Sequence, residues 1–187
     1  WKSTLPGNNQ PLAISPPTQG AAAHDAHDTS SYVTASSLSG NYLRVQVRFT
    51  KDTVPVACAT ERIPIDIWAP PVSQVTAAEF ATIATRTGHE WHVSDDDTGL
   101  SMAEWGAKLR GSLVTLESLL LTLPLHIGLA LEVVLDEPDS APINPCIDAL
   151  LHAVYDAAGR EKKSRRLFFG SAVPSACVAL NWKQPNY

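Results

Sequence analysis

The sequence predicts an α/β fold in which strands and helices alternate along one chain. Residues 42–49 alternate between apolar and polar side chains, as a half-buried strand does. Residues 128–135 are almost continuously apolar, which suits a parallel strand covered on both faces. Helix-capping signals and helix-like spacing fill the stretches between and after these segments. Strands separated by helices in this order favour repeated βα units and a parallel sheet.

A strand and a short partner strand are predicted within residues 42–58. The apolar face of the first strand holds Leu43, Val45, Val47 and Phe49, and its polar face holds Arg44, Gln46 and Arg48. Residues 50–53 (TKDT) favour a turn. The β-branched and apolar residues 54–58 favour the second strand.

A capping box places the first helix after these strands. Thr76 and Glu79 form the box, and Val75 and Phe80 occupy the two positions of a hydrophobic staple. The helix that follows is predicted to end near Gly88, because glycine readily adopts the left-handed conformation that ends helices.

Two further helices are predicted before the apolar run. Ser101 and Glu104 form a second capping box, which opens a short helix that ends by Gly111. Thr115 can cap a helix over residues 116–123, and the proline that follows terminates it.

The last part of the chain adds a strand, a helix, a strand and a helix. Glu132 is the single carboxylate within the apolar run 128–135, and a buried carboxylate is uncommon unless it is paired. Asn144 as N-cap and a proline after it predict a helix that stops at Gly159. Residues 165–170 favour a strand, and residues 174–180 favour a short helix.

Composition limits the class of protein. With 187 residues, 44% of them hydrophobic and 18% charged, the chain can bury the core of one domain. The net charge of −5 offers no basic surface for nucleic acid or an anionic membrane. No apolar run approaches the roughly 20 residues of a membrane span. Residues 1–31, rich in Pro, Gly, Ser, Ala and Asn, are predicted to be a flexible linker before a domain over residues 32–187.

Cysteine usage bears on the compartment. Cys58, Cys146 and Cys177 are too few and too scattered for a disulfide framework, and Cys58 and Cys177 lie in apolar sequence surroundings. Reduced thiols in a cytoplasmic or nuclear protein are therefore expected.

Two groups of residues are candidates for a metal site, and both are better explained otherwise. His24 and His27 have no cysteine or third histidine at ligand spacing, so a solvated loop is expected. His89, His92 and the acidic run 95–97 lack the ligand spacing of a calcium loop or a zinc protease. A polar surface insertion is expected there.

The sequence of residues 50–56, TKDTVPV, resembles part of the signature of the glycerophosphodiester phosphodiesterase (GDPD) family. That signature runs Glu-x-Asp-Val-Gln-Leu-Thr-Lys-Asp-x-Val-Pro-Val and is followed by His-Asp. Three more segments resemble the family in the same order: LVTLESLLLTLP (113–124), IGLALEVVLDEP (127–138) and RLFFGSAVPSACVALNWKQPNY (166–187). The resemblance implies a (β/α)8 TIM barrel, which takes about 250 residues. Residues 32–187 suffice for about five βα units. The expected fold is therefore a partial (β/α)8 TIM barrel truncated at its C-terminal end.

The resemblance also implies which residues stand at the family's functional positions. In that family carboxylates hold a divalent cation, and two histidines act as general acid and base. The first metal Glu falls on Arg44, the Asp on Gln46, the second His on Ala59 and the phosphate-holding Lys on Val134, so that only Glu132 remains. A divalent cation needs several oxygen ligands, and Arg44 puts a positive charge in its place. A degenerate site with no catalytic residue, metal or cofactor is therefore expected.

The degenerate site and the KQPNY ending most resemble the C-terminal part of fungal phosphate-pathway regulators, which carry an SPX domain and ankyrin repeats. These proteins inhibit a cyclin–cyclin-dependent kinase pair. The resemblance implies a non-catalytic regulatory domain in phosphate-starvation signalling, with a small phosphate-containing ligand and with a cyclin–kinase complex held by other regions of the full-length protein. Two alternatives stay open: an active metal-dependent phosphodiesterase, and a structural domain without a ligand.

One contact is predicted from these positions. If Arg44 ends its strand and Glu132 lies on the next, both side chains face the mouth of the barrel. A partly desolvated carboxylate is costly without a counter-charge, which the arginine can supply. An Arg44–Glu132 ion pair within about 4 Å is therefore expected.

Overall fold

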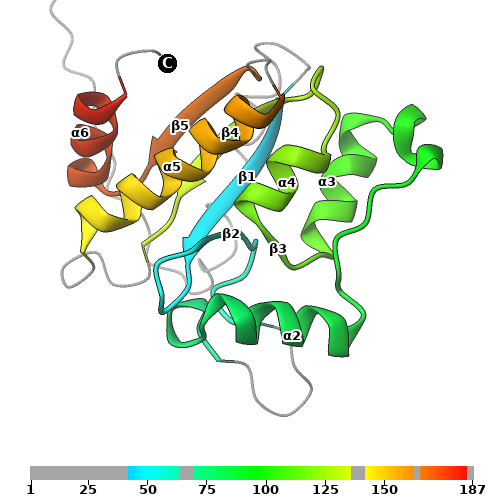
Figure 1. Cartoon of the computed structure of the whole chain (residues 1–187), viewed down its shortest axis with the longest axis horizontal. Helices are drawn as coiled ribbons and strands as arrows, with labels where there is room; N and C mark the ends of the chain where they lie inside the picture. Colours follow the sequence, from blue (N-terminus) through cyan, green and yellow to red (C-terminus); the bar gives the residue numbers. More distant parts are fainter. Residues whose placement is uncertain (1–41, 64–69, 136–141, 162–164, 185–187) are drawn as a thin grey trace, which may run out of the picture.

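The fold is described by a computed structural model for residues 42–63, 70–135, 142–161 and 165–184. The predicted linker 1–31, with His24 and His27, lies outside these residues. A five-stranded sheet in the order β3–β2–β1–β4–β5 forms the centre of the molecule (Figure 1). Its strands are β1 (Tyr42–Phe49), β2 (Pro55–Ala57), β3 (Val114–Thr115), β4 (Gly128–Val133) and β5 (Leu167–Ser171).

The sheet is mixed rather than parallel throughout. Strands β1, β4 and β5 are parallel, as expected, whereas β2 pairs antiparallel with both β1 and β3. The expectation of a wholly parallel sheet is thus wrong for β2 and β3. A parallel pair needs a crossover of about a dozen residues or more, and only a short turn joins β1 to β2. This turn is closed by a 3.1 Å hydrogen bond from the Thr50 N–H to the Val54 carbonyl.

The helices follow the capping signals closely. They are α2 (Ala77–Thr87), α3 (Met102–Arg110), α4 (Leu116–Thr122), α5 (Ile143–Glu161) and α6 (Pro174–Lys183), with short 3-10 helices η1 (Val72–Gln74) and η2 (Asp95–Gly99). Both predicted capping boxes are present, at Thr76 and at Ser101. Gly88 ends α2 in the left-handed conformation, with φ of 70°.

The limits of α5 differ from the expected ones. Asn144 lies inside the helix rather than at its N-cap, and the helix continues through Gly159 to its end at Glu161. A glycine inside a helix costs about 1 kcal/mol. Buried apolar residues spaced along the helix, such as Ile147, Leu150 and Val154, outweigh that cost by packing in the core.

The main hydrophobic core lies between the sheet and the helices α3, α4 and α5, which cover one of its faces (Figure 1). The alternate residues Leu129, Leu131 and Val133 of β4 are buried in it. Ala130, Glu132 and Val134 point the other way and are half-buried. The expectation that this strand is covered on both faces is therefore wrong, and the half-buried face carries the polar residues of β1 and β4. A smaller core cluster packs α2, through Phe80 and Ala84, against Val56 and Leu113.

The Arg165 side chain links the end of α4 to the segments that lead into β4 and β5. It was expected to begin a strand, but β5 starts at Leu167, and the Arg165 side chain is buried. Its Nη1 donates to the carbonyls of Pro124 at 2.7 Å and Ile127 at 2.8 Å, and its Nη2 donates to those of Leu120 at 3.1 Å and Leu123 at 2.5 Å. The last carbonyls of a helix have no partners within the helix. One guanidinium thus serves the carbonyl of Leu120 in the last turn of α4, that of its C-cap Leu123, and two carbonyls of the loop that follows.

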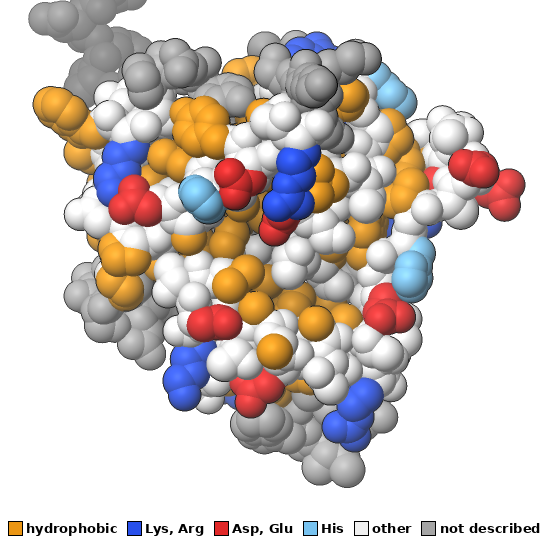
Figure 2. Space-filling model, viewed as in Figure 1, with side chains coloured by type: hydrophobic (Ala, Val, Ile, Leu, Met, Phe, Trp, Pro, Cys, Tyr) orange, Lys and Arg blue, Asp and Glu red, His pale blue; other side chains and the backbone are white. Residues whose placement is uncertain are grey.

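The surface over α5 carries charges of both signs. Figure 2 shows blue and red side chains interspersed with orange ones across this face of the molecule. Within the described ranges, no helix is both long and apolar enough to span a membrane.

Candidate functional site

Three of the five expected positions come together on the half-buried face of the sheet. Gln46 of β1 lies directly opposite Glu132 of β4 in the parallel register. Arg44 lies two residues before Gln46 and therefore on the same face. Its direct neighbour on β4 is Ala130, whose small side chain leaves room for the guanidinium to reach along the sheet. Arg44 is the third residue of β1, so its expected place at the end of the strand is wrong.

The expected ion pair is confirmed. The Arg44 guanidinium donates two hydrogen bonds to Oε2 of Glu132, from Nη2 at 2.6 Å and from Nε at 3.1 Å. The amide of Gln46 donates a third to the same oxygen at 3.3 Å. The Arg44 and Glu132 side chains are 23% and 26% exposed, so the pair is partly withdrawn from water but still reached by it.

The two remaining positions lie at the borders of this group. Val134 follows β4 on the same face as Glu132, and its N–H donates to the Val47 carbonyl at 2.9 Å. Ala59 is exposed just after β2, and the N–H of the preceding Cys58 donates to the Gln46 carbonyl at 3.1 Å. Neither Val134 nor Ala59 has a side chain that can carry charge or transfer a proton.

The side chains in this group do not fit a divalent cation. Mg²⁺ and Ca²⁺ require several oxygen ligands, and Glu132 supplies the only carboxylate among the five positions. Its Oε2 already accepts hydrogen bonds from a cation and an amide. Nowhere in the described part of the chain do three His, Cys, Asp or Glu side chains group so as to hold a metal.

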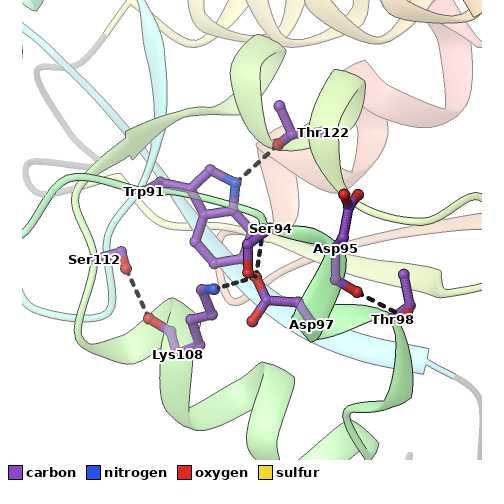
Figure 3. A network of polar contacts seen from close by, with 8 residues as sticks. All are labelled: Trp91, Ser94, Asp95, Asp97, Thr98, Lys108, Ser112 and Thr122. Atoms are coloured by element: carbon purple, nitrogen blue, oxygen red, sulfur yellow. Dashed lines mark hydrogen bonds and ion pairs between the residues drawn. The ribbon is translucent and has the colours of Figure 1, made fainter.

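The acidic run after α2 lies partly on the surface, as expected, but one of its carboxylates is buried in an ion pair, which we call the Asp97–Lys108 clamp. Asp95 and Asp96 are exposed, but Asp97 is buried and pairs with Lys108 at 2.6 Å (Figure 3). Asp97 also accepts from the Ser94 N–H at 2.6 Å. Hydrogen bonds from Lys108 and Ser94 hold the pKa of the Asp97 carboxyl below its usual value. This network joins η2 to α3 and lies apart from the Arg44 site.

The two histidines beside the acidic run are likewise used locally. Nδ1 of His89 lies 2.8 Å from the Gly111 carbonyl, and Nε2 of His92 lies 3.4 Å from Glu90. Neither contact involves the acidic run or the residues around Glu132.

All three cysteines are free. Cys58 and Cys146 are buried, and burial raises the pKa of the Cys146 thiol. Cys177 is exposed, although its neighbours in the sequence are apolar. In the sequence it lies between the buried Ala176 and the exposed Val178 of α6, so apolar neighbours in the sequence do not by themselves bury a helical residue.

Sequence reasoning missed two arginines and one amide. From the sequence, Gln46 is expected only as the replacement of a metal-binding aspartate, whereas in the structure its amide donates a hydrogen bond to Glu132. Arg48, on the same face of β1, is buried, and Arg165 is a structural anchor. Period-two alternation places Gln46 and Arg48 on the same face as Arg44, but it does not show what their side chains contact, and no local signal marks Arg165.

Comparison with known proteins gives similarity in sequence and in fold. No family model matches the chain. The chain is 33% identical over 177 residues to the ankyrin repeat protein nuc-2 of Neurospora crassa, and this match covers 86% of the chain. It is 26% identical over 211 residues to the glycerophosphocholine phosphodiesterase GDE1 of Candida albicans, and this match covers 83% of the chain. The chain spans only 17% and 18% of the lengths of these two relatives.

Two solved structures share its fold. One, from Silicibacter pomeroyi, is assigned as a glycerophosphoryl diester phosphodiesterase, with a TM-score of 0.53 and 16% identity. The other is an Oleispira antarctica phosphodiesterase in complex with the product sn-glycerol-3-phosphate, with a TM-score of 0.53 and 15% identity. The matches cover 84% and 82% of this chain, but only 56% and 54% of those proteins. The chain thus has the fold of just over half of such a phosphodiesterase.

Proposed function

We propose that this chain is a degenerate GDPD-like domain with a non-catalytic, regulatory role. Its similarity in sequence to nuc-2, and in fold to part of the barrel of glycerophosphoryl diester phosphodiesterases, supports the proposal. One observation carries the proposal. The guanidinium of Arg44 is bound to Glu132, the single carboxylate among the five positions where the family's functional residues are expected.

The chemistry of the residues supports a site without catalysis. Hydrolysis of a phosphodiester in this family needs a cation to neutralise charge on the phosphoryl group and a base to prepare the attacking group. Arg44 and Gln46 can donate hydrogen bonds but cannot act as bases, and Ala59 and Val134 can do neither. The five residues can therefore orient or bind a ligand, but they cannot move a proton from it except through Glu132.

A small phosphate-containing molecule is the ligand we propose for this domain. Arginine and amide donors suit phosphate oxygens, and guanidinium forms especially favourable pairs with them. Arg44 and Gln46 carry such donors on a face that solvent reaches, where a phosphate would compete with Glu132 for them.

We place this domain in a larger protein of phosphate-starvation signalling in the cytoplasm or nucleus. The similarity to an ankyrin repeat protein over only 17% of its length supports that setting. Inhibition of a cyclin–cyclin-dependent kinase complex, if the full-length protein performs it, would be exerted by other regions.

The test of the non-catalytic role is a turnover assay. The chain is incubated with glycerophosphocholine and excess Mg²⁺ or Ca²⁺, and released glycerol 3-phosphate is measured beside an active phosphodiesterase. We expect no release above background. Metal-dependent turnover that disappears in Glu132→Ala would overturn the proposal and establish the active enzyme instead.

The test of the ligand is a binding screen with phosphate, inositol phosphates and glycerophosphodiesters, followed by calorimetry. Binding that is lost in Arg44→Ala but kept in Arg86→Ala, which removes an exposed arginine on α2, supports a ligand at this site. If no compound of the three classes binds, the purely structural alternative is favoured.

A further inference from the structure

The donors around Glu132 converge on a single point. Two side chains of β1 and one of β4 meet at Oε2 of Glu132, with donor–acceptor distances of 2.6, 3.1 and 3.3 Å. Gln46 lies opposite Glu132 in register, and Arg44 belongs to the same face. All three positions are on paired strands, so the backbone holds them in a fixed relation.

The three side chains that meet at this oxygen carry one positive and one negative charge. Arg44 brings one positive charge, Glu132 one negative charge, and Gln46 none. A carboxylate partly withdrawn from water needs a positive partner, which can be a bound metal ion or a protein cation. The arginine is permanently charged, and its planar group contacts the carboxylate through two nitrogens.

We propose that the Arg44 guanidinium acts as a built-in substitute for a divalent cation, and that a metal site remains latent beneath it. The proposal rests on the non-catalytic function above, and explains it by one residue. It makes two claims: the natural chain takes up no Mg²⁺ or Ca²⁺ at Glu132, and exchange of the two donors for carboxylates creates a site that does.

The second claim follows from the geometry. Arg44→Glu and Gln46→Asp would put two carboxylates on the face of β1 that adjoins Glu132. Both side chains are shorter than those they replace, which leaves space for a cation between them and Glu132. Three carboxylates on adjacent strands supply several oxygen ligands on a partly exposed face, and solvent can complete the coordination. Calcium tolerates irregular geometry better than magnesium, so it is the better probe.

The experiment compares four proteins by calorimetric titration with CaCl₂ and by thermal unfolding with CaCl₂ or EDTA. They are the natural chain, Gln46→Asp, Arg44→Glu/Gln46→Asp, and the last with Glu132→Gln added. The double variant should bind calcium with Kd on the order of 10⁻⁴–10⁻³ M, as weak protein calcium sites do. Excess calcium should raise its Tm by about 3 °C or more. Gln46→Asp is the matched control, because it adds a carboxylate but keeps the guanidinium.

Each outcome decides the inference. Calcium binding by the double variant alone, lost when Glu132→Gln is added, supports it. A folded double variant that binds no calcium overturns it, as does calcium binding by the natural chain that requires Glu132. If the double variant is unfolded in EDTA, recovery of its circular dichroism spectrum with calcium counts in favour.

If calcium fails to restore the fold of the double variant, a second variant with less repulsion between carboxylates is tested instead. Arg44→Gln/Gln46→Asp brings only two carboxylates together. Weak calcium binding by this protein, absent in Gln46→Asp, supports the inference, and absence of binding overturns it. Turnover by the natural chain would instead overturn the proposed function, so the two failures are distinguishable.

Discussion

Glu132 depends on its neighbours in an uneven way. All three described hydrogen bonds reach one of its two carboxylate oxygens, and two of them come from the same guanidinium. Removal of Arg44 leaves the Gln46 amide as a single neutral donor to a partly desolvated charge. The cost of such a loss comes mainly from the charge left behind rather than from the attraction that disappears.

Arg44→Ala should therefore lower the free energy of unfolding by about 1–3 kcal/mol. Urea unfolding followed by circular dichroism measures the change. The matched control Arg86→Ala removes an exposed arginine near the end of α2 and should cost less than about 1 kcal/mol.

A double-mutant cycle separates the two contributions. Because Glu132→Gln removes the charge that Arg44 serves, Arg44→Ala should cost less in that background. Equal losses for Arg44→Ala and Arg86→Ala, or no coupling with Glu132→Gln, would show that the ion pair contributes nothing to stability.

At the scale of single elements, α4 depends on a residue from outside the helix. Arg165, just before β5, binds four carbonyls at and after the end of α4. It thereby fixes where the chain turns from α4 into β4. A positive charge at the C-terminal end of a helix is also favoured by the helix dipole.

We expect Arg165→Ala to cost about 3 kcal/mol or more, because several buried carbonyls lose a charged donor. Arg165→Lys should recover only part of the loss, since an ammonium group cannot span the same fork. Arg166→Ala is the neighbouring control: Arg166 is exposed, and its hydrogen bond to the His126 carbonyl is 3.4 Å long. Denaturant unfolding that ranks Arg166→Ala at or above Arg165→Ala would contradict this role.

The Asp97–Lys108 clamp should make stability depend on acid. The pKa of Asp97 is lower in the folded chain than its ordinary value, chiefly because of the hydrogen bond from Lys108. Its contribution is therefore fully present above the unfolded pKa, about 3.9, and is lost as the pH falls through the lower folded pKa.

Thermal unfolding between pH 7 and pH 2.5 checks this. The Tm difference between the natural chain and Asp97→Asn should be largest near neutral pH and should shrink below about pH 4. Asp96→Asn, which changes an exposed carboxylate in the same short helix, should lower the Tm by much less. A difference for Asp97→Asn that stays constant over the whole range would rule out the clamp as the acid-sensitive element.

Local chemistry explains which elements the sequence could predict. The capping boxes at Thr76 and Ser101 involve residues three apart, so they can be read from the chain and are present in the structure. The start of α5 was misplaced because a proline is accepted anywhere in the first turn, where its missing N–H has no partner to lose. The position of Arg165 depends on carbonyls more than 35 residues away, which no local pattern can indicate.

For the whole molecule, two of the most exposed apolar side chains lie on α6. Trp182 is 81% exposed, Val178 lies one turn before it, and Phe168 of β5 is also exposed. In the sheet order, β5 is the strand beyond β4. Val178 and Trp182, one helical turn apart, thus form an exposed apolar strip on α6, and exposed apolar patches favour self-association.

Trp182→Ser should therefore raise the concentration at which the chain begins to scatter light, and should leave the Tm nearly unchanged because the indole makes little buried contact. Leu180→Ser is the matched control on the same helix: Leu180 is buried, and its loss should lower the Tm clearly. A Tm loss in Trp182→Ser as large as in Leu180→Ser, or unchanged solubility, would contradict the exposure of Trp182.

The candidate site illustrates how far a resemblance can reach. Alternation placed Arg44 and Gln46 on one face of a strand, and the similarity to a family placed Glu132 on the adjoining strand. The structure brings together these residues, which are 86 or more positions apart in the chain. The antiparallel pairing of β2 and β3 was not predicted, because the helix–strand order of the chain does not specify which strands pair.

The Arg44–Glu132 contact also has a consequence for mutational history. If Arg44 alone changed to an acidic residue, two carboxylates would face each other before any third ligand existed, and the fold would suffer. If Gln46 alone became acidic, the guanidinium would still occupy the place of the ion. On the proposal made above, each single acidic substitution is thus costly or without effect, and only the joint change would create a cation site. The ion pair thus makes positions 44 and 46 interdependent, because an acidic residue at either position alone causes a loss of stability or has no effect.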